Sequence, residues 1–189
     1  MNDLLAAYGY DDQVRQAFGQ VLGQVAASAS EEPLPARVTR VDRGSCLVVT
    51  GSGMLRASPY TVTSRRAGLA GEPTTGDWVA VAGPPGGEQA IVALLERRSF
   101  LARRAPDDRD RYQQAIAANI DVIAVTAALD RPDGAGRIER TLAMVWESGA
   151  TPVVVLTKAD IARDIETSLE AAARVSLGAD LIVTSSETG

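Results

Sequence analysis

The fold of the second half of the chain is indicated by one short stretch, residues 152–160, which reads Pro-Val-Val-Val-Leu-Thr-Lys-Ala-Asp. Its uninterrupted apolar start predicts a strand that is buried on both faces, as strands of parallel sheets are. Apolar residues recur at helical spacing over 137–148 and again from Ile161, and further β-rich runs cover 121–127 and 181–184. We therefore predict a parallel sheet covered by helices, with any ligand bound beyond the carboxyl ends of its strands.

Three polar side chains follow this strand directly, at the sheet edge where a ligand is expected. Guanine offers two adjacent donors, N1–H and its amino group, and the carboxylate of Asp160 can accept both, each bond contributing about 1.5–3 kcal/mol. The stem of Lys158 can lie along the face of the base, and the hydroxyl of Thr157 can brace the loop. The alternative is an ordinary strand-end loop in which Asp160 caps the next helix.

A second polar segment follows the next predicted strand, again at its carboxyl end. Ser185 and Ser186 lie there, and the backbone N–H of Ser186 is placed to donate to the guanine O6. The two loops together favour guanine binding. Lys158 is the only lysine in the chain, so these 189 residues hold no lysine for a phosphate-binding Gly-x-x-x-x-Gly-Lys-Ser/Thr loop.

The first half of the chain has a different pattern. A helix is predicted from Asp11 onward, followed by a linker. Short β-rich runs, separated by glycine and proline turns, then cover residues 36–42, 45–50, 54–58, 77–82 and 90–95. They predict a five-stranded barrel, with an OB-type barrel favoured because a long connection separates the third and fourth runs. A barrel of the same size without a nucleic-acid role is the alternative.

These patterns divide the chain into four parts. We expect a helix and linker over residues 1–32, the barrel over 33–100, an arginine-rich connector over 101–115 and the α/β part over 116–189. The chain has one cysteine and no histidine, which excludes internal disulfides and zinc clusters. It has no apolar run near the roughly 20 residues that cross a bilayer and no signal-peptide pattern, so we expect a cytoplasmic protein without a membrane partner.

The formal net charge of −5 is unevenly distributed, since residues 33–66 hold six arginines against one acid. Such a basic segment indicates a surface that faces phosphates, although arginines on strand faces are often only solvated. Few aromatic residues accompany it, and Trp78 is expected in the core, so RNA contacts would be electrostatic or shape-driven. The predicted RNA-contacting residues are Arg37, Arg40, Arg43, Arg56, Arg65 and Arg66.

The motifs resemble those of a known family. The loop at 157–160 resembles the Asn-Lys-x-Asp motif of GTPases, with Thr157 in place of Asn, and Ser185-Ser186 resembles their Ser-Ala motif. A barrel that precedes these motifs, with no phosphate loop before them, is similar to the circularly permuted ribosome small subunit-dependent GTPase family, RsgA (YjeQ). The similarity covers residues 33–189 and includes the stretches 76–81, 97–104, 117–121 and 146–150.

The resemblance implies a function. Members of the family bind GTP or GDP and act in late maturation of the small (30S) ribosomal subunit, and the barrel would contact 16S rRNA. The phosphate loop, the residues that hold Mg²⁺ and a domain with structural Zn²⁺ would follow residue 189. Without that phosphate loop and Mg²⁺, residues 1–189 alone are expected not to hydrolyse GTP. We also expect a monomer. The alternative is an RNA- or protein-binding barrel module with a nucleotide-free α/β part.

Overall fold

The computed structural model describes residues 3–25, 31–59, 72–104, 113–130, 134–176 and 178–188. The chain divides into two compact units. The first consists of Met1–Arg98 with Ala102–Asn119, and the second of Ser99–Leu101 with Ile120–Gly189. Among the described helices, none is long and apolar enough to cross a membrane.

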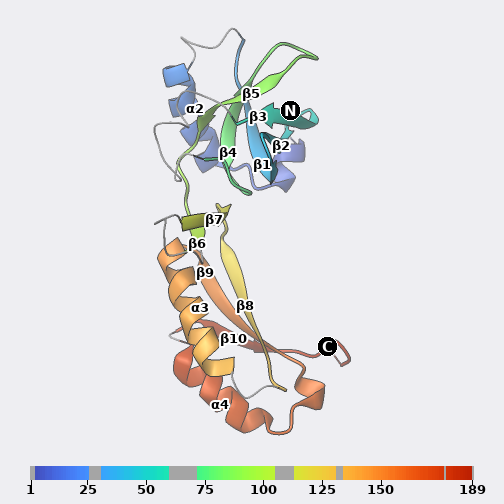
Figure 1. Cartoon of the computed structure of the whole chain (residues 1–189), viewed down its shortest axis with the longest axis vertical. Helices are drawn as coiled ribbons and strands as arrows, with labels where there is room; N and C mark the ends of the chain where they lie inside the picture. Colours follow the sequence, from blue (N-terminus) through green and yellow to red (C-terminus); the bar gives the residue numbers. More distant parts are fainter. Residues whose placement is uncertain are drawn as a thin grey trace. The chain divides into compact units, whose positions relative to one another are not determined.

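The first unit is built on a closed five-stranded barrel (Figure 1). Its strands are connected in the order β1-β2-β3-β5-β4, and β1 also pairs antiparallel with β4, which closes the barrel. This confirms the predicted barrel, and each strand begins within two residues of its predicted start. The strands are β1 (Leu34–Asp42), β2 (Ser45–Thr50), β3 (Gly53–Ser58), β4 (Trp78–Ala82) and β5 (Gln89–Leu94).

Two helices pack on the outside of this barrel, α1 (Asp3–Ala7) and α2 (Asp12–Val25). Val14 and Phe18 of α2 are buried against Trp78, which confirms that the indole belongs to a core. Asp11 caps α2, because its Oδ1 accepts a hydrogen bond from the Val14 N–H at 2.8 Å. This bond, supported by Arg98, holds the pKa of Asp11 below its ordinary value.

A buried ion pair lies at the start of β4. Asp77 is 0% exposed, and its carboxylate accepts hydrogen bonds from Arg97 Nε at 2.8 Å, Arg97 Nη2 at 2.7 Å and the Thr74 N–H at 2.7 Å. Gly76, just before it, has a φ of +92°, and a Cβ there would lie 2.1 Å from the carbonyl oxygen of Ala118. Only glycine fits at this position. In the sequence Gly-Asp-Trp at 76–78, Gly76 therefore makes the turn, and Asp77 and Trp78 are buried.

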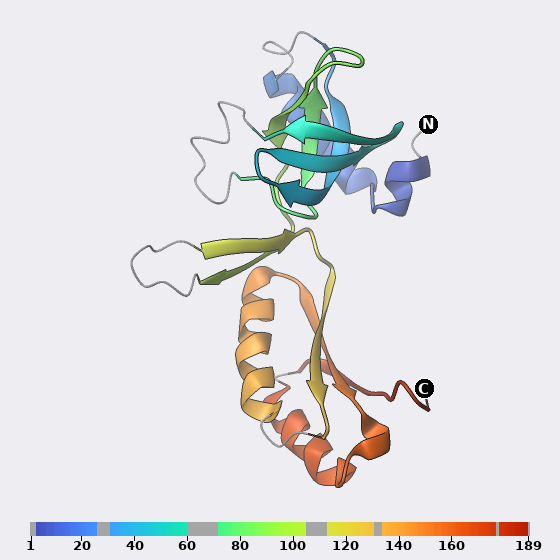
Figure 2. The same ribbon diagram turned by 45° about the vertical axis from the view of Figure 1, so that its right-hand side comes forward.

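The arginine-rich connector contains a strand pair that was not predicted. β6 (Phe100–Arg104) and β7 (Gln113–Ala118) form a two-stranded sheet (Figure 2). Beyond β7, Asn119 has a φ of 53° and is buried; its side chain accepts from the Arg98 N–H at 3.0 Å and donates to the Gly76 carbonyl at 3.1 Å. The residues between the two strands, 105–112, are outside the described part of the chain.

The second unit contains the predicted parallel sheet, with strand order β10-β9-β8. Helices α3 and α4 pack on one face, against a core that includes Val125, Val154 and Leu156 (Figure 1). The elements are β8 (Val122–Ala128), α3 (Gly134–Ser148), β9 (Thr151–Thr157), the 3₁₀ turn η3 (Ala159–Ile161), α4 (Ile165–Val175) and β10 (Asp180–Val183).

The predicted start of the second helix was wrong by about one turn. Ile161 lies in η3 and is 57% exposed, whereas α4 begins at Ile165 after the cap residue Asp164, whose Oδ1 accepts from the Thr167 N–H at 3.0 Å. Ile161 shares the apolar spacing of α4 although it lies outside the helix, and the hydrogen bond at Asp164 sets the true start.

The opposite face of the sheet is apolar and open. Val122 of β8 and Ile182 of β10 are 57% and 51% exposed, and Val153 and Val155 of β9 between them are only half-buried. Within the described residues β8 pairs with β9 alone, so its other edge carries unpaired backbone groups. An open edge next to an apolar face favours association.

Candidate functional site

Two loops meet beyond the carboxyl ends of β9 and β10, where the sequence predicts a ligand site. The Thr184 N–H donates to the Leu156 carbonyl at 2.9 Å, and the Ala159 N–H donates to the Thr184 carbonyl at 3.3 Å. These two backbone bonds hold the loop at 157–160 beside the segment that begins at Ser185. The parallel register of β9 and β10 brings both loops to one edge.

The side chains of Asp160 and Ser185 join these loops. The Ser185 hydroxyl donates to Asp160 Oδ1 at 2.5 Å and itself accepts from the backbone N–H of Glu187 at 3.0 Å. Ser185 is buried while Asp160 is exposed, so a buried hydroxyl orients a carboxylate that solvent or a ligand can reach. The alternative in which Asp160 caps the following helix is wrong, because Asp164 is the cap residue of α4.

Lys158 has an unusual backbone and a defined partner. Its φ of 62° and ψ of 42° lie in the left-handed region, which costs a non-glycine residue about 1–2 kcal/mol. Its ammonium Nζ lies 2.8 Å from Oδ2 of Asp130. Asp130 was not predicted as a site residue, although it follows β8 and so lies at the same sheet edge as the two predicted loops.

Thr157 and Ser186 complete the set of predicted loop residues. The Thr157 hydroxyl donates a long bond of 3.4 Å to the Ala127 carbonyl, and its own carbonyl accepts from the Leu129 N–H at 2.9 Å. Thr157 therefore links the ends of β8 and β9. Ser186 lies in the exposed turn after Ser185.

The predicted RNA-contacting arginines divide into different environments. Arg37 points inward: it donates to the carbonyls of Tyr8, Gly76 (3.3 Å) and Asn119 (3.0 Å), and its guanidinium lies 5.3 Å from the Trp78 ring centroid. These contacts give it a structural role that its sequence context did not indicate.

The other arginines lie at the surface or outside the described residues. Arg40 and Arg56 are exposed and share Asp42 as an ion-pair partner, at 2.9 and 3.0 Å. Hydrogen bonds from both guanidinium groups lower the pKa of Asp42. Arg43 is exposed. Arg65 and Arg66 fall in a range whose structure is not described.

Structural Zn²⁺, which the family resemblance implies, is held by a cluster of donor side chains, whereas Mg²⁺ is usually held by one or two side chains together with phosphates and waters. Within the described residues, no group of three or more His, Cys, Asp or Glu side chains is arranged to hold a metal ion.

Comparison with known proteins shows that the chain is similar to one family. A family model described as RsgA GTPase matches residues 94–189. The small ribosomal subunit biogenesis GTPase RsgA of Streptomyces coelicolor is 43% identical over 164 residues, a match that covers 85% of this chain and 41% of that protein. The protein of the same name from Opitutus terrae is 35% identical, with 98% of this chain and 51% of that protein covered.

Solved structures share the fold. YloQ, described as a circularly permuted GTPase, superposes with a TM-score of 0.60 at 20% identity, covering 82% of this chain and 52% of that one. YjeQ from Thermotoga maritima gives a TM-score of 0.58 at 20% identity and covers 82% and 53%. The chain thus spans about half the length, or less, of the proteins it matches.

Proposed function

Because the chain belongs to the RsgA GTPase family, we propose that it supplies the guanine-recognition part of a GTPase acting in maturation of the small (30S) ribosomal subunit. The observation that carries this proposal is the contact between Asp160 and Ser185, which joins two loops at the carboxyl edge of a parallel sheet. An exposed carboxylate held by a buried hydroxyl is suited to a ligand that presents paired donors.

In the proposed complex the carboxylate of Asp160 accepts from guanine N1–H and the amino group. An ionised carboxylate has about four acceptor positions, so the bond from Ser185 leaves capacity for both. The stem of Lys158 lies along the base while Asp130 fixes its ammonium, and the Ser186 N–H donates to O6. Adenine would place an acceptor against the same carboxylate, which is unfavourable.

The rest of the proposed activity depends on parts that these residues do not supply. Phosphoryl transfer to water is mainly positioning and charge stabilisation by a phosphate loop, Mg²⁺ and an ordered water, and the single lysine of this chain is already in the base loop. We therefore propose that residues 1–189 bind the guanine base without hydrolysing GTP. Mg²⁺ and structural Zn²⁺ would be held by residues elsewhere in the whole protein.

For the barrel we propose electrostatic contact with 16S rRNA. Arg43 is exposed, and Arg40 and Arg56 are exposed enough for a phosphate to compete with their shared partner Asp42. Arg65 and Arg66 extend the same basic segment of the sequence. Arg37 would support this surface from within through its carbonyl contacts. Such binding weakens steeply as salt concentration rises.

The guanine proposal is tested by Asp160→Asn in the protein expressed from its complete reading frame. An amide at this position can donate to the O2 of xanthine, so preference should move from GDP towards XDP by at least tenfold. Affinities for fluorescent GDP and XDP give the ratio. Asp164→Asn is the matched control, because that carboxylate caps α4 and should leave the ratio unchanged. An unaltered ratio in the Asp160 variant would show that Asp160 does not read the base. If the wild type bound neither nucleotide, the alternative of a nucleotide-free module would be favoured.

A further inference from the structure

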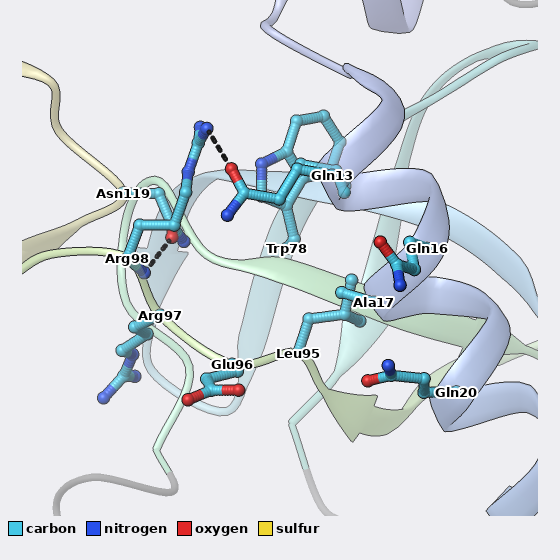
Figure 3. Close-up of a pocket in the computed structure, with 11 residues that line it drawn as sticks. Gln13, Gln16, Ala17, Gln20, Trp78, Leu95, Glu96, Arg97, Arg98 and Asn119 are labelled. Atoms are coloured by element: carbon cyan, nitrogen blue, oxygen red, sulfur yellow. Dashed lines mark hydrogen bonds between the residues drawn. The ribbon is translucent and has the colours of Figure 1, made fainter.

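A polar pocket of about 400 Å³ lies in the barrel unit (Figure 3). Helix α2 lines one side with Gln13, Gln16 and Gln20, and the segment 95–98 after β5 lines the other. Trp78 lies behind Gln13 in the view of Figure 3. The three glutamines are spaced so that they share one face of the helix. A pocket of this size is within the range of small-ligand sites.

The charges at this pocket are already offset by neighbouring groups. Arg97 pairs with the buried Asp77 at 2.7 Å, and Arg98 pairs with Asp11 at 3.1 Å. The exposed carboxylate of Glu96 also lines the pocket. An anionic group would find guanidinium ions that are engaged and a carboxylate that repels it. The lining instead suits a neutral ligand rich in hydrogen-bond donors and acceptors.

One buried donor at the pocket lacks an acceptor among the described residues. Trp78 is 2% exposed and lines the pocket, yet its indole Nε1 has no hydrogen-bond partner there. Buried polar groups are nearly always paired, so such an exception calls for an explanation. Gln13 lies beside it with its Oε1 3.4 Å from Arg98 Nη1, which is long for a hydrogen bond. Because Gln13 is exposed and weakly held, its side chain can turn and open Nε1 to an acceptor from a ligand.

We propose that this pocket binds a single unstacked nucleobase of RNA. Glutamine and asparagine amides pair with base edges through matched donors and acceptors, and sequence-specific RNA recognition mostly targets bases that are splayed out of a helix. Gln16 and Gln20 would read the edge of the base, and a base carbonyl would accept from Trp78 Nε1. The proposal goes beyond the guanine site and does not depend on it, and it adds base recognition to a barrel from which the sequence predicts only electrostatic contact.

An extended peptide fits the pocket less well than a base. Peptides commonly bind by adding a strand to a free sheet edge, but the five barrel strands are closed on one another. Peptide helices need an apolar groove for their anchors, whereas this pocket is lined mainly by amide and charged side chains. The geometry therefore favours the nucleobase.

The test uses residues 1–189 carrying Trp146→Phe, so that Trp78 is the sole source of indole fluorescence. Single-stranded homo-oligoribonucleotides of adenine, guanine, cytosine and uracil are titrated against it. We expect a change in Trp78 emission and at least a tenfold preference for one base. The double variant Gln16→Ala/Gln20→Ala should weaken binding to that base at least tenfold while the dependence of affinity on salt stays the same, because no phosphate contact is removed.

Controls separate this pocket from the basic surface and from a peptide site. Gln89→Ala removes a half-buried barrel glutamine that does not line the pocket, and binding should be unchanged. Arg40→Ala should weaken all four oligonucleotides equally and reduce the salt dependence. Circular dichroism checks that each variant folds. The proposal is overturned by equal affinity for all bases, by wild-type affinity of the double glutamine variant, or by binding of a short-peptide pool in place of oligonucleotides.

Discussion

The buried ion pair of Asp77 and Arg97 allows the sharpest prediction about stability. In Asp77→Asn the fold loses the charge that offsets the Arg97 guanidinium, whose side chain is only 9% exposed. In the wild type three N–H donors bond to the carboxylate, and in the variant they would face an amide with a single acceptor oxygen. Removing one partner of a buried pair typically costs about 3–5 kcal/mol. This is a large part of the roughly 5–15 kcal/mol that stabilises a domain.

Urea unfolding followed by Trp78 fluorescence, in a Trp146→Phe background, measures this loss for the barrel unit. With a slope of about 2 kcal/mol per molar, the midpoint should fall by roughly 2 M. Asp42→Asn is the control, since Asp42 also pairs with two arginines but in solvent, where screening leaves little to lose. The double variant Asp77→Leu/Arg97→Met should recover much of the lost stability, because it leaves no buried charge. A midpoint shift equal to that of the control would refute the reasoning.

Two further predictions concern titratable groups. Burial, with smaller contributions from Asp77 and Asp42, raises the pKa of Cys46 to about 11. At pH 8 only about a thousandth of this thiol is then ionised, so a disulfide reagent should label it only after urea unfolding. Fast labelling of the native protein would contradict this prediction. The hydrogen bond from the Thr167 N–H lowers the pKa of Asp164 below its ordinary 3.8. The ionised carboxylate therefore stabilises the fold above pH 3.8 and loses this effect as the pH falls through its lower folded pKa. Asp164→Ala should abolish this part of the acid-induced loss of helix signal, measured by circular dichroism between pH 5 and pH 2. An unchanged acid transition would show that the cap contributes nothing.

The barrel could be predicted because its strands are short β-rich runs separated by turn residues such as Gly51 and Ser52. The parallel sheet could be predicted because its strands are apolar without interruption. Helix α1 has only five residues, too few for a period to appear. The β6–β7 pair was missed because arginines occupy the end of β6 and mask any apolar alternation. Pairing of such strands depends on a partner elsewhere in the chain, which a local pattern does not contain.

The candidate site shows the same division between local and long-range information. The positions of Thr157, Asp160 and Ser185 follow from one topological rule, that parallel strands place their carboxyl ends at one edge. The Asp130 contact with Lys158 depends on where two side chains meet, 28 positions apart in the sequence. The inward direction of Arg37 likewise depends on carbonyls and an indole supplied by distant segments. The charge pattern of the sequence indicated an exposed cation at Arg37, but in the folded barrel its guanidinium points inward.

The left-handed backbone of Lys158 sets stability against the proposed base recognition at one position. Glycine and asparagine adopt a φ of 62° more readily than lysine, so a screen for heat-resistant variants is expected to return them at this site. Each of them would remove the ammonium and its ion pair with Asp130. Such trade-offs between stability and activity arise where a functional residue is held in a strained conformation. Directed evolution of this domain for thermal tolerance would therefore need position 158 to be held fixed.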